Sequence, residues 1–148
     1  MKTFTKRTQR RLTLGAIFTI TVLVLAGCGG GSVSRQEVTR EFFTYINNDY
    51  DAASIRTLLD SSAAFANSAD ADYWKARIPD ANAPYNVTST TESGSNVTAQ
   101  VTDSATTPTN LSYRFEFTEE GSDGLFSSVS YRIRRIVDIT VTPSTIFE

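Results

Sequence analysis

Histidine is absent from this 148-residue sequence, and cysteine occurs only once. Without histidine, the chain has no imidazole general base, no Ser-His-Asp triad and no His-ligated zinc site. A single cysteine forms no disulfide within the chain and builds no site of several thiolates. The sequence therefore excludes imidazole catalysis and metal sites made from His or Cys, and we expect no cofactor.

The sequence also lacks an apolar segment long enough to cross a membrane comfortably. The apolar, uncharged stretch over residues 12–25 has fourteen residues, fewer than the roughly 20 that a spanning helix needs. Five basic residues and no acid precede it: Lys2, Lys6, Arg7, Arg10 and Arg11. A basic flank before a short apolar core is typical of a cleaved signal peptide.

The lone cysteine closes this segment as Leu25-Ala26-Gly27-Cys28. The tetrapeptide resembles the lipobox of bacterial lipoproteins. The resemblance implies cleavage after residue 27, a diacylglyceryl group on Cys28 and a stable hold on membrane lipid through two or three acyl chains. It places the protein in the cell envelope on the extracytoplasmic side, and Gly29 favours the outer membrane of a Gram-negative cell. An ordinary secretory signal with a chance cysteine is the alternative.

Removal of the signal peptide makes the remaining chain more acidic. Cleavage leaves residues 28–148, of which 28–33 form a Gly-rich flexible tether. The signal takes five of the 14 basic residues and none of the 16 acidic ones, so the mature net charge is −7. A chain this acidic is not expected to bind nucleic acid or to be held electrostatically on anionic lipid.

The first part of the mature chain has helical periodicity. The spacing predicts a helix over residues 34–47, with Ser34 and Glu37 as a capping box. Two shorter helices are expected next, with these N-cap residues: Asp51 for the second, and Ser68 or Asp70 for the third.

From Tyr85 onward, apolar and polar residues alternate, which predicts strands. Four strands are expected, and the last one carries apolar residues at odd positions from 129 to 141. Residues 143–148 are expected to form a tail. Helices followed by an antiparallel meander predict a single α+β domain over residues 34–142, with two to three helices packed on about four strands.

Two stretches, residues 42–53 and 131–137, resemble the beginning and the last strand of nuclear transport factor 2-like domains. The resemblance implies a curved sheet that wraps the first helix into a cone with a pocket at its open end. It also makes a homodimer through the sheet an open expectation. Enzymes and binding modules share this fold, so the fold alone does not select a function.

Arg135 shares the odd parity of its apolar neighbours, so in a regular strand it would point into the core. A buried guanidinium needs a carboxylate or a ligand anion, which makes Arg135 a candidate ligand-binding residue at the cone mouth. A β-bulge near Arg134 that turns the side chain outward is the alternative. Five aromatic residues are candidates for the cavity wall, with core packing as the alternative: Tyr45, Tyr73, Trp74, Tyr113 and Tyr131.

The acidic residues give little indication of a metal site or of a catalytic site. Asp49 and Asp51 are close enough for a cation site, but capping and turn formation explain both, and we expect no metal. Asp103 and Asp138, the nearest candidates for an Asp–Tyr catalytic pair, are expected in a loop or on the solvent face. We therefore expect a non-catalytic binding module for a small apolar or anionic ligand or for an envelope protein. The alternatives are a lyase or isomerase and a structural accessory subunit of a membrane complex.

Overall fold

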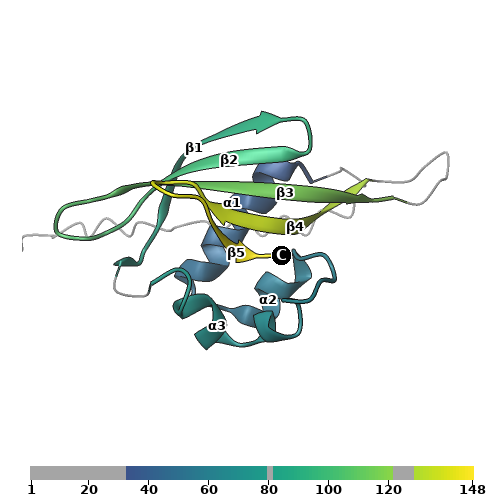
Figure 1. Ribbon diagram of the computed structural model, residues 1–148, viewed down its shortest axis with the longest axis horizontal. Coiled ribbons are helices and arrows are strands. Elements are labelled where there is room, and N and C mark those ends of the chain that lie inside the picture. Colours follow the sequence, from purple (N-terminus) through teal and green to yellow (C-terminus); the bar gives the residue numbers. More distant parts are fainter. Residues whose placement is uncertain (1–32, 80–81, 122–128) are drawn as a thin grey trace, which may run out of the picture.

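The computed structural model describes residues 33–79, 82–121 and 129–148 (Figure 1). The predicted signal peptide, the lipidation site Cys28 and the tether up to residue 32 lie outside these residues. Helices come first: α1 (Arg35–Asn47), α2 (Ala52–Thr57), the 3-10 turn η1 (Asn67–Ala69) and α3 (Ala71–Lys75). Five strands follow: β1 (Asn86–Ser93), β2 (Asn96–Thr102), β3 (Asn110–Glu120), β4 (Ser130–Asp138) and β5 (Ser144–Phe147).

The predicted α+β class is confirmed. The five strands form one antiparallel sheet in chain order, β1-β2-β3-β4-β5. Helix α1 crosses one face of this sheet and contacts β1, β2 and β4, while α2 and α3 lie on the β5 side (Figure 1). Among the described residues, no helix covers the opposite face, which we call the open face.

Local capping chemistry explains where the helices begin. The Ser34 backbone N–H donates to the Glu37 carboxylate at 2.7 Å, and the Glu37 N–H donates back to Ser34 Oγ at 3.2 Å. This is the predicted capping box, which satisfies two helix-end donors reciprocally. Asp51 caps α2 and Asp70 caps α3, as their carboxylates accept the Ser54 and Asp72 N–H groups.

Aromatic residues of α1 form the centre of the core. Phe42 and Phe43 are 0% and 1% exposed and pack edge to face against each other, with ring centroids 5.4 Å apart. Phe42 also meets Trp74 of α3 and Phe115 of β3, each at 5.4 Å. One helix thereby joins the sheet to the short helices.

A β-bulge in β4 changes which side chains face the core. Glu116 pairs with Arg135 but the next residue of β3, Phe117, pairs with Ile133, so Arg134 is the extra residue. Beyond the bulge the parity changes: the even-numbered Ile136 faces the core, whereas odd-numbered residues were predicted to do so. The expected alternation from 129 to 141 is therefore wrong after Ile133.

The sheet has five strands rather than four, because residues predicted to be a tail form β5. Ile146 and Phe147 of this strand are 5% and 1% exposed. The Phe147 ring stacks on Trp74 at 6.2 Å between centroids, and the Tyr73 hydroxyl donates to the Ile146 carbonyl at 3.0 Å. A four-residue strand with so few apolar residues is fixed by these long-range contacts, which local alternation does not reveal.

Replacing Phe42 by alanine should lower the free energy of unfolding by about 3–5 kcal/mol, because it removes a buried ring that three other rings contact. The matched control is Val141→Ala at a side chain that is 90% exposed, where we expect a change below about 0.5 kcal/mol. Urea unfolding followed by circular dichroism measures both. Similar midpoints for the two variants would contradict the assignment of Phe42 as the core centre.

Candidate functional site

The aromatic residues predicted to line a cavity are distributed through the domain. Trp74 is fully buried, and its indole N–H donates to the Ser68 carbonyl at 3.0 Å. Tyr113 is 3% exposed with its ring 5.4 Å from Phe43, and burial raises the pKa of its hydroxyl. Both residues are core residues, which is the alternative interpretation of the aromatic set.

Tyr45 of α1 and Tyr131 of β4 are both half-buried, and they lie near different ends of α1. The Tyr45 hydroxyl donates to the Glu41 carboxylate one turn earlier, and this hydrogen bond raises its pKa to about 12. The Tyr131 ring lies 4.2 Å from the guanidinium of Arg35, the first residue of α1. The structure therefore does not bring the predicted wall residues to one cavity.

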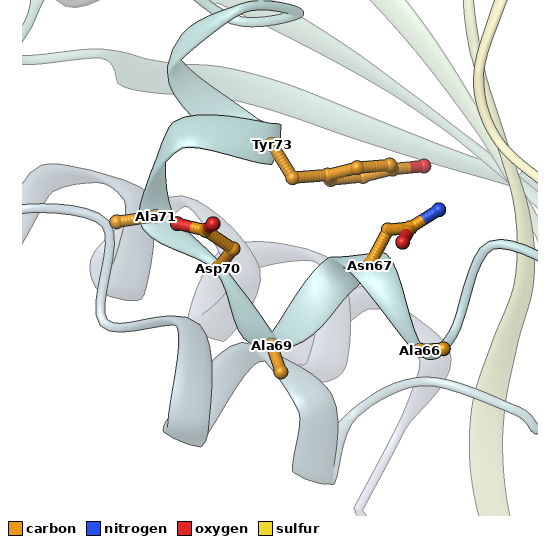
Figure 2. A pocket seen from close by; sticks show the side chains of 6 residues that line it. All are labelled: Ala66, Asn67, Ala69, Asp70, Ala71 and Tyr73. Atoms are coloured by element: carbon orange, nitrogen blue, oxygen red, sulfur yellow. The ribbon is translucent and has the colours of Figure 1, made fainter.

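One hollow lies outside the sheet, on η1 and α3 (Figure 2). It has a volume of about 550 Å³, is open to solvent, and is lined by Ala66, Asn67, Ala69, Asp70, Ala71 and Tyr73. Two of its three polar side chains are engaged in structure, since the Tyr73 hydroxyl donates to the Ile146 carbonyl of β5 and Asp70 caps α3; Asn67 is the third. Three alanines complete the lining, so the hollow offers few groups for specific recognition.

Arg135 lies on the open face, within a group of charged side chains on β3 and β4. Glu116 lies 3.6 Å from Arg114 Nε and 3.7 Å from guanidinium nitrogens of both Arg134 and Arg135. We call the three arginines around Glu116 the arginine cluster. Arg135 also lies 3.5 Å from Glu148 Oε2, and it donates to Thr145 Oγ1 at 3.3 Å.

The bulge builds this cluster. In a β-bulge, two residues of one strand lie opposite one residue of its partner, and here Arg134 and Arg135 lie opposite Glu116. Both guanidinium groups consequently reach the same carboxylate. The inward position expected for Arg135 in a regular strand is thus wrong, and the bulge alternative is confirmed. The adjacent Arg-Arg pair was the sequence signal for this arrangement.

The two acidic residues considered for catalysis, Asp103 and Asp138, accept hydrogen bonds from nearby backbone N–H groups and so stabilise turns. Asp103 is 4% exposed, and its Oδ1 accepts the N–H groups of Ala105 at 3.3 Å and Thr109 at 2.8 Å. Asp138 lies opposite the buried Tyr113 in the sheet, because the bulge moves it from the expected solvent face to the core side. Its Oδ1 accepts the Thr140 N–H at 2.8 Å.

The Asp49–Asp51 pair is explained without a cation. Asp49 forms an exposed ion pair with Lys75 at 3.4 Å, and Asp51 caps α2. Within the ranges that the structure describes, no three His, Cys, Asp or Glu side chains gather in a way that could hold a metal ion. The same residues contain no helix that is long and apolar enough to cross a membrane.

Arg135→Ala should change the free energy of unfolding by less than about 1 kcal/mol, because the side chain forms partly exposed ion pairs. Ile136→Ala, one residue away and fully buried, should cost about 2–5 kcal/mol. Chemical unfolding of the two variants checks the register of β4. A large loss at Arg135 with little loss at Ile136 would place the arginine in the core.

Glu41→Gln should move the pKa of Tyr45 from about 12 back toward its ordinary value of 10.0, because the neighbouring carboxylate disfavours the tyrosinate. A raised tyrosine pKa stabilises the fold below pH 10.0, and this contribution is lost as the pH rises through about 12. Ultraviolet titration of tyrosinate measures the shift, with Tyr45→Phe identifying its share of the signal. Identical titrations for the wild type and Glu41→Gln would refute the coupling.

Comparison with known proteins adds no relative: no protein-family model matches the chain, and neither a curated protein nor a solved structure is significantly similar to it.

Proposed function

We propose that the chain is an envelope lipoprotein with a nuclear transport factor 2-like domain, held on the membrane by acylated Cys28. In this proposal it acts as a non-catalytic binding module whose open face contacts an envelope protein. The carrying observation is the separation of two residue sets. The predicted cavity aromatics Trp74 and Tyr113 are packed in the core, whereas charged side chains gather around Arg135 on the open face.

The attachment of the tether supports an anchored role. The tether meets the domain just before Arg35, which lies 15% exposed between several elements. Its guanidinium contacts Glu92 of β1 at 2.6 Å, Glu119 of β3, and the face of the Tyr131 ring. These contacts tie the start of α1, which follows the proposed tether in the chain, to β1, β3 and β4.

The packing of the core favours surface contact over the alternatives with a pocket. A lyase or isomerase of this fold needs a cavity with a desolvated acid inside it. Here Asp103 accepts two backbone N–H groups and Tyr113 packs against Phe43, so both are engaged in structure. A small ligand in the cone competes with the same aromatic packing. The remaining alternative, a structural accessory subunit of a membrane complex, also uses surface contact with another protein.

Cys28→Ser should move the full-length protein from the detergent-soluble membrane fraction to the aqueous phase or leave it as an uncleaved precursor, since serine accepts no thioether-linked lipid. Mass spectrometry of the wild-type N-terminal peptide should show Cys28 with its acyl mass. Ser32→Ala in the tether is the matched control and should partition as the wild type does. A Cys28→Ser protein that is processed and retained like the wild type would overturn the lipoprotein assignment.

Photo-crosslinking in cells tests the binding surface. A photoreactive residue at Gln100 or Thr145, both exposed on the open face, should capture the same envelope protein. The matched controls place the residue at Ala53 of α2 or Asp72 of α3, which are also exposed. Capture from the helix positions but not from the open face would contradict the proposal.

A further inference from the structure

We infer that the arginine cluster is a carboxylate-binding site that takes an acidic segment of the partner protein. This inference rests on the proposed function and names the chemistry of its contact. The cluster lies on the uncovered side of the two central charged strands, with Arg114 on β3 and Arg134 and Arg135 on β4. An approaching peptide meets these side chains without crossing another described element.

The first argument is the charge balance. Three guanidinium groups surround one carboxylate, that of Glu116, whose side chain is 17% exposed. Glu148 adds a second carboxylate only at the margin, through a 3.5 Å contact from a side chain that is 67% exposed. Positive charge therefore exceeds negative charge at this place, although the mature chain as a whole is acidic.

The second argument is that donors remain available. All three contacts to Glu116 measure 3.6–3.7 Å, longer than a hydrogen bond. The Arg134 side chain is 62% exposed, so its guanidinium donors are open to an approaching carboxylate. A guanidinium carries five N–H donors in a planar fork that matches a carboxylate. An added carboxylate can thus be bonded without breaking a short contact within the cluster.

The third argument is that a buried apolar residue, Val137, lies beside the charged side chains of the cluster. Val137 is 2% exposed but belongs to the open face, where its register partners are Arg114 and Thr145. It is absent from the core cluster that packs on α1. Attraction between charges next to a buried apolar side chain is screened less than attraction in open water.

Glu148 shows which anion suits the cluster. Its exposed carboxylate already lies against Arg135 Nε, so the chain itself places a glutamate side chain where an external one would dock. A contact this long and exposed contributes little stability and is easily displaced. The net acidity of the mature chain opposes a general attraction to an anionic lipid surface. Recognition of acidic peptides by groups of arginines follows from the same geometry.

Calorimetric titration of the full chain in neutral detergent micelles tests the inference, with a peptide of six glutamates as the probe and a peptide of six glutamines as the control. The glutamate peptide should bind and the glutamine peptide should not. Combined Arg134→Ala and Arg135→Ala substitutions should weaken binding at least about tenfold, because charge-assisted hydrogen bonds are lost. The matched control Arg40→Ala, an exposed arginine of α1, should leave the affinity unchanged.

Glu148→Gln should have the opposite sign and tighten binding by about two- to fivefold, because it removes the internal competitor for Arg135. Circular dichroism confirms that each variant is folded. Unchanged affinity after the double arginine substitution, or equal binding of the two peptides, would overturn the inference. Displacement of the peptide by an equal concentration of inorganic phosphate would also overturn it, since the site would then select phosphate.

The outcome is separable from that of the proposed function. If the open face captures a partner by crosslinking but the glutamate peptide does not bind, the surface is correct and its carboxylate chemistry is wrong. If neither result is obtained, the proposed function fails as well.

Discussion

The burial of Phe42 and Phe43 between the sheet and the short helices is the interaction on which the rest of the structure depends. Both rings pack against Phe115; Phe42 also meets Trp74, and Phe43 also meets Tyr85 and Tyr113. Because one helix thereby contacts both halves of the domain, its loss exposes the inner sides of β2, β3 and β4 together.

The bulge at Arg134 is the second constraint, and it decides what the open face presents. One extra residue turns Arg135 outward beside Arg134 and brings Ile136 inward against the core. A regular strand would have placed the charge of Arg135 among aromatic rings, where an unpaired guanidinium costs several kcal/mol. The bulge therefore preserves the core and at the same time concentrates three arginines around Glu116.

Together these features separate the residues that stabilise the fold from those at its surface. The inner face of the sheet is filled by apolar side chains, whereas the outer face carries polar and charged ones, among which the contacts around Glu116 are long and partly exposed. Surface groups of this kind contribute little to the free energy of folding. Arg35 joins the start of α1 to β1, β3 and β4.

The sequence by itself determined the α+β order, the helix starts at Ser34 and Asp51, and the alternation through Phe117, because caps and regular strands depend on residues close together in the chain; for the third helix it left Ser68 and Asp70 open, and the structure has Asp70 as the cap. Only the tertiary structure decided the side on which Arg135 lies, the strand formed by Ser144–Phe147 and the filling of the core by Trp74 and Tyr113. Each of these depends on a partner far away in sequence: Glu116 for the bulge, β4 for β5, and the rings of α1 for the core. Local periodicity carries no information about such partners, so a one-residue bulge is enough to reverse every inward assignment that follows it.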